Sequence, residues 1–230
     1  MKIGIIVAMG KELQFMLPLL SNQRETVIAG NKFYTGSIGD HDVTLYQCGI
    51  GKVNAALGAY MMITHFEPQL VINSGVAGAA DKSVSVMDIV VGAKVAYHDV
   101  WCGPESIWGA VQGLPLYYVG AEPVVKALEN EKNVRLGLIC SGDQFIDTLD
   151  AVLSIKDKFP EALAVDMESG AIAQVCYLNK VPFVSMRIIS DSPMASHDNT
   201  QDYNDFWEAA PQQTFNLISN LLTKLSNINL

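Results

Sequence analysis

The chain has 230 residues, of which 50% are hydrophobic and 17% are charged, so it can bury the core of one large α/β domain. Its formal net charge of -9 and the lack of any run of basic residues exclude nucleic-acid binding through the phosphate backbone. No apolar run approaches the roughly 20 residues of a membrane span, and no signal-peptide cleavage pattern is present, so we expect a cytoplasmic protein without a membrane partner.

The first half of the chain is expected to begin with a buried strand over residues 3–7 and an amphipathic helix over residues 12–20. Three further strands, separated by polar turns, predict an antiparallel meander over residues 26–28, 33–38 and 42–48. The glycine-containing turn at 49–52 then opens a helix that runs to about residue 65. Its glycine spacing fits neither a P-loop nor a dinucleotide-binding fingerprint.

Strands alternate with helices in the second half, as is typical of α/β domains. The expected strands cover residues 70–73, 88–98, 135–140, 162–165 and 181–190, and the expected helices cover 122–131, 148–158, 171–178 and 203–225. Residues 74–78 are expected to form a small-residue loop that ends one strand and leaves backbone N–H groups for a ligand. No repeat or linker interrupts this order, so we expect a single domain over residues 1–230.

Residues 99–116 are too irregular for a helix or a strand and contain Trp101 and Trp108. A loop of this length within a compact domain is usually functional or lies at an interface. A surface loop that is merely anchored by its two tryptophans explains the sequence equally well, so both interpretations stay open.

Carboxylates gather where the predicted strands end. Asp166 and Glu168 directly follow a buried strand and precede an alanine-rich helix. Glu12 follows the first strand, and Asp191 ends the last one. In an open α/β sheet this edge is where ligands bind. Acids also favour helix N-termini, so capping is the competing explanation for Asp166 and Glu168, and the commoner one for Glu12. Arg187 lies inside the last apolar strand, where its burial requires an acidic partner.

Motifs for other kinds of chemistry are missing from the sequence. The four histidines are widely separated, and no His–Cys set has the spacing of a metal site, so no metal is expected. The four cysteines form no Cys-x-x-Cys pair and are expected to be free thiols. The Gly-x-Ser-x-Gly elbow of the α/β-hydrolases is absent. What remains is acid–base chemistry by carboxylates, as in the cleavage of glycosidic bonds.

Several segments, taken in their order along the chain, resemble one known family. They are Lys-Ile-Gly-Ile-Ile-x-Ala-Met at 2–9, Cys-Gly-Ile-Gly-Lys-Val at 48–53, Gly-x-Ala-Gly at 75–78, Gly-Asp-x-Phe-Ile at 142–146, Val-x-Met-Glu at 165–168 and Arg-x-Ile-Ser-Asp at 187–191. On these segments the chain resembles, nearly from end to end, the bacterial 5′-methylthioadenosine/S-adenosylhomocysteine nucleosidases of the nucleoside phosphorylase superfamily. The resemblance implies a three-layer α/β/α sandwich with a mixed, twisted central sheet.

The resemblance also implies roles for matching positions. Glu12 would be the catalytic base that activates water, and Asp191 would be the catalytic acid that protonates N7 of the departing adenine. Glu168 would hold the ribose hydroxyls, and Arg187 would help to position the water. The other positions expected to line the substrate site are Met9, Ile50, Val76, Ala77, Gly78, Phe145, Ile146, Asp166, Met167, Ser190 and Tyr203.

The implied reaction is hydrolysis of the N-glycosidic bond of 5′-methylthioadenosine and S-adenosylhomocysteine, with 5′-deoxyadenosine as a further candidate substrate. The products would be adenine and the free thiopentose, in methionine salvage. The family is homodimeric and uses no metal or organic cofactor, and the region around Pro115 would reach the partner subunit. Three alternatives remain: a phosphate-dependent purine nucleoside phosphorylase, a futalosine-type nucleoside hydrolase and a catalytically silent nucleoside-binding homologue.

The chain departs from the family pattern at several positions. Asp166 stands where the family usually has Glu, and Val76 stands where many members have Ser. Val7 and Gly10 replace Gly and Glu near Glu12. Each change could alter the rate or the choice of substrate without altering the type of reaction.

The nucleophile is expected to be water rather than phosphate. A phosphate site needs convergent positive charge, commonly from Arg. Neither the loop at 8–12 nor the segment at 74–78 contains an Arg, and Arg24 and Arg135 lie away from every predicted strand end. Arg187 alone is left to face the pocket, because the neighbouring Glu12 would cancel the charge of Lys11.

Overall fold

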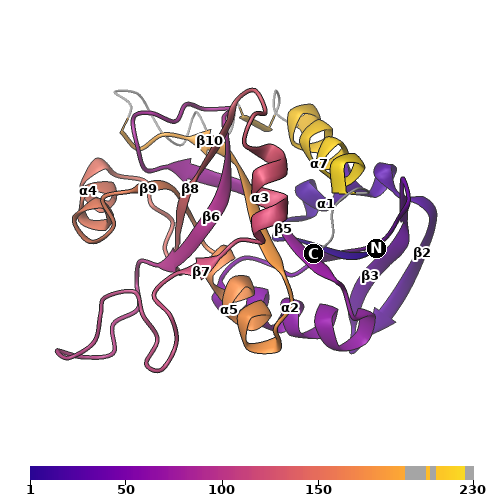
Figure 1. Ribbon diagram of the computed structural model, residues 1–230, viewed down its shortest axis with the longest axis horizontal. Helices are drawn as coiled ribbons and strands as arrows, with labels where there is room; N and C mark the ends of the chain where they lie inside the picture. Colours follow the sequence, from indigo (N-terminus) through magenta and orange to yellow (C-terminus); the bar gives the residue numbers. More distant parts are fainter. Residues whose placement is uncertain (195–205, 208–210, 226–230) are drawn as a thin grey trace.

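A ten-stranded mixed sheet forms the centre of the protein in a computed structural model, which describes residues 1–194, 206–207 and 211–225 (Figure 1). The strands are β1 (Lys2–Val7), β2 (Ser21–Ile28), β3 (Asn31–Ile38), β4 (His41–Gln47), β5 (Leu70–Ala79), β6 (Ile89–Tyr97), β7 (Tyr118–Val119), β8 (Val134–Ser141), β9 (Ala162–Asp166) and β10 (Phe183–Asp191). Their order is β10-β6-β8-β9-β5-β1-β4-β3-β2, with β7 paired to β6. The predicted α/β class with a mixed sheet is confirmed.

Strands β2, β3 and β4 confirm the predicted antiparallel meander. β2 pairs antiparallel with β3, and β3 pairs antiparallel with β4, while β1 lies parallel between β4 and β5. β2 begins at Ser21, earlier than the predicted residue 26. It is an edge strand whose residues are exposed up to its last position, so no alternating apolar pattern marks its start.

Five of the strands close into a ring. β10 pairs in parallel with β5 and antiparallel with β6. β8 lies parallel to both β6 and β9, and β9 returns antiparallel to β5. The sequence did not predict this closure, because it joins strands that are far apart in the chain. The description of the fold as a three-layer sandwich stays a prediction.

Helices cover both faces of the sheet. Those of the described residues are α1 (Gly10–Met16), α2 (Lys52–Phe66), α3 (Glu122–Leu128), α4 (Leu149–Lys158), α5 (Ser169–Asn179) and α7 (Pro211–Leu225). α2 and α5 pack together on one face, and α1, α3 and α7 lie on the other (Figure 1). The predicted helix over 12–20 ends at Met16, because Pro18 disfavours its continuation and lies in a short 3-10 turn. Thr148 caps α4 and accepts a hydrogen bond from the Ala151 amide at 3.4 Å.

The expectation of a loop over residues 74–78 is wrong, because β5 continues to Ala79 and pairs with β10 along this segment. The small residues have another cause. A Cβ atom on Gly75 would lie 2.4 Å from Arg187 Nη1 and 2.6 Å from Glu12 Oε1. Glycine therefore leaves room for two charged side chains to lie against the strand.

The segment 99–116 contains no helix or strand, as predicted. The rings of Trp101 and Trp108 stack with their centroids 6.2 Å apart, and Trp108 Nε1 donates to the His98 carbonyl at 2.8 Å. The tryptophans therefore anchor the loop, yet Trp101 and Ile107 remain exposed. Both interpretations of the loop stay compatible with this arrangement.

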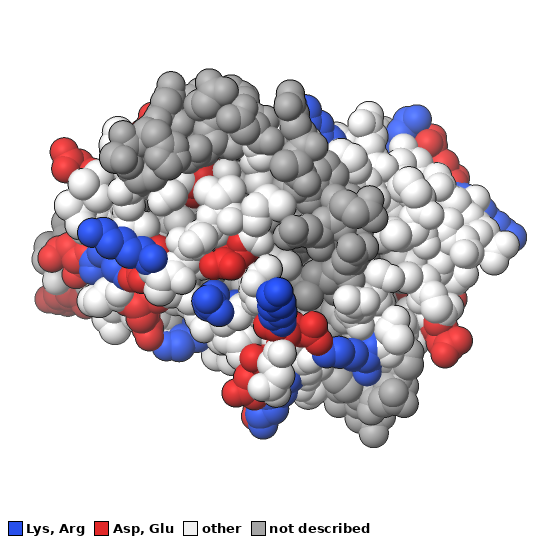
Figure 2. Space-filling view, turned by 90° about the horizontal axis from the view of Figure 1, so that it is seen from above, with Lys and Arg blue, Asp and Glu red and all other residues white. Residues whose placement is uncertain are grey.

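The charges on the face shown in Figure 2 are mixed. Basic and acidic side chains lie next to one another there, and the residues drawn in blue form no broad basic field. Along the part of the chain that the structure describes, no helix is both long enough and apolar enough to cross a membrane.

Candidate active site

A pocket with about 610 Å³ of empty space, partly open to solvent, lies where β5, β9 and β10 meet the loop after β1. Every predicted site residue within the described part of the chain lines it: Met9, Glu12, Ile50, Val76, Ala77, Gly78, Phe145, Ile146, Asp166, Met167, Glu168, Arg187, Ser190 and Asp191. Tyr203 lies outside the described residues. The lining also includes Ala8, Gln144 and Val165, which were not predicted. The residues therefore converge as expected, while their roles stay predictions.

Glu12 is a buried acid that both caps a helix and faces the pocket. Its Oε2 accepts hydrogen bonds from the backbone amides of Ala8 at 2.9 Å and Met9 at 2.8 Å, at the start of α1. Its Oε1 accepts from the Val76 amide at 3.2 Å, across on β5. Burial raises the pKa of Glu12, while Arg187 and the three amides lower it. The capping and pocket explanations are therefore both right for this residue.

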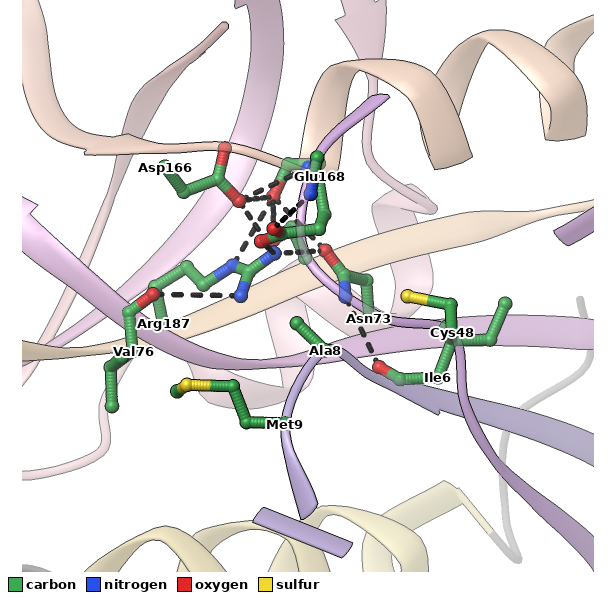
Figure 3. A network of polar contacts seen from close by, with 12 residues as sticks. Ile6, Ala8, Met9, Cys48, Asn73, Val76, Asp166, Glu168 and Arg187 are labelled. Carbon is green, nitrogen blue, oxygen red and sulfur yellow. Dashed lines mark hydrogen bonds and ion pairs between the residues drawn. The ribbon is translucent and has the colours of Figure 1, made fainter. Parts of the chain in front are cut away.

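Arg187 lies beneath the pocket with only 1% of its surface exposed. Its Nη2 is 2.5 Å from Asp166 Oδ2 and 3.5 Å from Glu168 Oε2, and it also donates to the side-chain carbonyl of Asn73 (Figure 3). The prediction that Arg187 meets an acid is confirmed. The single positive charge of Arg187 therefore faces two carboxylates, those of Asp166 and Glu168, in a buried site.

Glu168 directly precedes α5, and its side chain contacts a turn that is distant in sequence. Its Oε1 accepts from the Gly51 amide at 3.0 Å, in the turn before α2. Burial, with Asp166 and Glu12 nearby, raises the pKa of Glu168 to about 7 even though Arg187 lowers it. This carboxyl group can therefore gain or lose a proton near neutral pH.

Asp191 ends β10 at the other side of the pocket. Its Oδ1 accepts from the Ser190 hydroxyl at 2.5 Å. A Cβ atom on Gly78 would lie 3.4 Å from Asp191 Oδ2 and 3.9 Å from the Ile146 carbonyl oxygen. Glu12 approaches β5 at Gly75, and Asp191 approaches it at Gly78. Both acids line the same pocket.

Three buried polar residues behind the pocket were not predicted: Asn73, Ser169 and Ser185. All three contact the Arg187–Asp166 pair or one another. Asn73 and Ser185 could have been noticed as polar residues inside apolar strands, which is the signal that identified Arg187.

Asp143 lies in the loop after β8 and does not line the pocket. It accepts from the Lys52 amide at 2.7 Å, and its own amide donates to Asp99 at 2.9 Å. It therefore ties the loop after β8 to the turn before α2. Within residues 1–194, 206–207 and 211–225, no three His, Cys, Asp or Glu side chains are grouped so that they could hold a metal ion.

Known proteins with the same sequence features and fold were found by comparison. Residues 2–223 match the sequence profile of the phosphorylase superfamily. The chain is 38% identical over 229 residues to 5′-methylthioadenosine/S-adenosylhomocysteine nucleosidase of Staphylococcus haemolyticus, covering 97% of this chain and 100% of the relative.

Two solved structures are similar along nearly the whole chain. S-adenosylhomocysteine nucleosidase of Streptococcus pyogenes, in complex with 5-methylthiotubericidin, superposes with a TM-score of 0.92 at 34% identity, covering 98% of this chain and 97% of the other. The 5′-methylthioadenosine/S-adenosylhomocysteine nucleosidase of S. pneumoniae, with the transition-state inhibitor MT-ImmA, has a TM-score of 0.91 at 35% identity, covering 98% and 100%.

Proposed function

The chain belongs to the phosphorylase superfamily and, within it, to the 5′-methylthioadenosine/S-adenosylhomocysteine nucleosidases, and from this premise we propose that it hydrolyses the N-glycosidic bond of these two nucleosides. The products are adenine and the free thiopentose. The observation that carries the proposal is a single pocket that both Glu12 and Asp191 line. A nucleoside placed between them has its sugar carbon near the base and its purine near the acid.

Glu12 is suited to take the proton of the attacking water. Three backbone amides fix its two oxygens, so the carboxylate needs no reorientation during the reaction. Its buried position raises its pKa, which increases its affinity for that proton. Arg187 beside it limits the rise and keeps the ionised form accessible.

Asp191 is suited to protonate the leaving group. An adenine anion leaves poorly, so a proton delivered to N7 lowers the barrier. The Ser190 hydroxyl holds one oxygen of Asp191 in place. As the bond breaks, the sugar becomes cationic, and the carboxylates of Glu12 and Glu168 stabilise this charge more in the transition state than in the bound substrate.

Water fits this pocket better than phosphate as the nucleophile. Among the described lining residues, Arg187 is the one basic side chain, and it already pairs with Asp166 and Glu168. Lys11 is engaged elsewhere, with its Nζ 5.3 Å from the centre of the Trp207 ring. A phosphate dianion would meet acids without the arginines that it normally requires.

The test is a phosphate-free incubation of the purified protein with 5′-methylthioadenosine, followed by identification of adenine and of the sugar. We expect adenine and free 5-methylthioribose at a rate that added phosphate leaves unchanged. A pentose 1-phosphate, or a rate that rises with phosphate, would identify a phosphorylase. Turnover of futalosine alone would identify the futalosine-type enzyme. Glu12→Gln, purified in the same way, controls for contaminating activity, because it should bind substrate without releasing adenine.

We further propose that the single domain 1–230, with the three-layer architecture of its family, works as a cytoplasmic homodimer in methionine salvage. Support for the dimer comes from α2, where Val53, Leu57 and Tyr60 repeat at helical spacing and are 78%, 54% and 54% exposed. Trp101 and Ile107 of the loop after β6 are exposed as well. Unpartnered apolar side chains in such a number suit the surface of a second copy.

A further inference from the structure

A cluster of buried hydroxyl groups lies behind the Arg187–Asp166 ion pair, outside the pocket lining. Ser169 Oγ is 2.5 Å from Asp166 Oδ2 and 2.6 Å from Ser185 Oγ. The guanidinium of Arg187 donates to the same Ser169 oxygen from Nε at 3.3 Å and from Nη2 at 3.2 Å. Ser169 and Ser185 have no exposed surface. One hydroxyl group thus touches both members of the ion pair.

The protons in this cluster can be assigned from the partners. The side-chain amide of Asn73 donates to the Ile6 carbonyl at 3.1 Å, so its oxygen is the atom that faces Ser169, at 3.1 Å. That oxygen and Asp166 Oδ2 both only accept. Ser169 has one proton to give, and its contact with Asp166 is the shorter of the two. Ser185, whose hydroxyl has no other partner among the described residues, gives its proton to Ser169. The chain of donors is Ser185 to Ser169 to Asp166.

The hydrogen-bond donors around Asp166 converge on one of its two carboxylate oxygens. Oδ2 accepts from the Ser169 hydroxyl, from the Ser169 amide at 3.1 Å and from Arg187 Nη2. Oδ1 is buried and has no hydrogen-bond partner in the part of the chain that the structure describes. The carboxylate is therefore held from one side only, and Ser169 supplies two of its three donors.

The Ser169 hydroxyl also orients the guanidinium of Arg187. Arg187 presents its Nε and Nη2 edge to Ser169, while its Nη1 is directed past Gly75, where Glu12 Oε1 also lies. Without the Ser169 oxygen, Nε would lose its one acceptor among the described residues, while Nη2 would keep Asp166 and Asn73. A donor without an acceptor is costly here, because only 1% of the surface of Arg187 is exposed. The guanidinium would then turn toward other acceptors, and its position beside Glu12 would change.

We propose that Ser169, supported by Ser185, is a positioning residue for the hydrolysis: it holds Asp166 and Arg187 in the arrangement that sets Arg187 beside Glu12. The inference rests on the proposed function. Activation of water by Glu12 takes place in the transition state, so a displaced Arg187 should slow turnover more than it weakens substrate binding.

The experiment compares Ser169→Ala, Ser185→Ala and the double variant with the wild type, using 5′-methylthioadenosine as substrate and MT-ImmA as a transition-state probe. We expect Ser169→Ala to lower kcat about 10- to 100-fold while KM changes less than about 3-fold, because a small misplacement of reacting groups has effects of this size. MT-ImmA should bind more weakly by a factor similar to the loss in kcat/KM. Ser169→Thr, which keeps the hydroxyl, should recover most of kcat. The double variant should be no worse than Ser169→Ala, because both substitutions break one chain.

Ser141→Ala is the matched control. Ser141 is equally buried, and its hydroxyl has no hydrogen-bond partner among the described residues. Its substitution should leave kcat unchanged. Wild-type kcat in Ser169→Ala, independent losses that multiply in the double variant, or an equal loss in Ser141→Ala would each overturn the inference. If Ser169→Ala does not fold, the test uses the other two variants: Ser185→Ala should lower kcat more than it changes KM, and Ser169→Thr should keep most of kcat. A wild type that releases no adenine would contradict the proposed function instead.

Discussion

The four acids that line the pocket are not equivalent, because each has different surroundings. Glu12 is fixed by backbone amides, Glu168 by the Gly51 amide, and Asp166 by its contact with Arg187. Asp191 receives the Ser190 hydroxyl. When the pKa values of neighbouring acids are driven apart, a single pocket can hold a base and an acid at the same pH.

Asp191→Asn should lower the rate of adenine release about 10²–10⁴-fold, the usual contribution of a general acid. The amide has nearly the same shape, but it cannot donate a carboxylic proton to N7. The measurement is single-turnover release of adenine, with thermal unfolding recorded in parallel to show that the fold is intact. Turnover close to that of the wild type would remove Asp191 from the role of acid.

Glu168 should make the free energy of unfolding depend on pH. Its pKa is raised to about 7 in the folded protein, above the usual value of 4.5 for a glutamate. Between these values the folded protein holds a proton that the unfolded chain has lost, so stability falls as pH rises through this window. Glu168→Gln cannot ionise, so its stability relative to the wild type should rise across the same pH window. Above the window the gain should be on the order of 3 kcal/mol. Denaturant unfolding at pH 4 and pH 8 measures this gain; an equal difference at both pH values would contradict the assignment.

Among the elements, β5 contributes most to the site because its small residues let charged groups lie against it. Gly75 faces Arg187 and Glu12, and Gly78 faces Asp191. A strand with larger side chains at these positions would fill the space that the acids occupy.

Gly75→Ala should therefore reduce activity about 100-fold, since its methyl group would displace Arg187 or Glu12. Overpacking of this kind also costs about 1–3 kcal/mol of stability. Gly10→Ala is the control, because a Cβ there would meet its nearest neighbour, Gln47 Oε1, at 3.5 Å. Assays of kcat and of denaturant unfolding on both variants test the prediction, which fails if the two substitutions have the same effect.

Elements could be predicted where their signal lies in neighbouring residues, and not where it depends on distant ones. Acids after apolar runs identified the strand ends, because that signal lies within a few neighbouring residues. The extension of β5 through 74–78 was missed, because serine and glycine usually indicate turns, whereas the small residues here make room for Arg187 and Glu12. The Ser169 cluster was missed for the same reason, because its members come from three separate segments.

At the scale of the whole molecule, the proposed dimer would cover exposed apolar side chains of α2 and of the segment 99–116. The exposed side chains of α2 lie close in sequence to the pocket, since Ile50 lines it just before α2. Assembly and activity are therefore expected to be connected.

Leu57→Asp should increase the fraction of monomer in a sedimentation experiment at micromolar concentration, because a charge would be buried in the interface. Leu57 is 54% exposed in the single chain, so the monomer itself should fold normally. Val27→Asp is the control, since Val27 is 58% exposed on the edge strand β2. A wild-type protein that sediments as a monomer would contradict the dimer.

The ring of five strands has a consequence for the order in which the protein acquires activity. β10 is the last strand in the described part of the chain, and it inserts between β5 and β6 while carrying Arg187 and Asp191. Contacts between segments so distant in sequence form late in folding. During refolding from denaturant, enzymatic turnover should therefore return only with the slowest folding phase, and a chain that ends before β10 on the ribosome would have neither the acid nor the arginine.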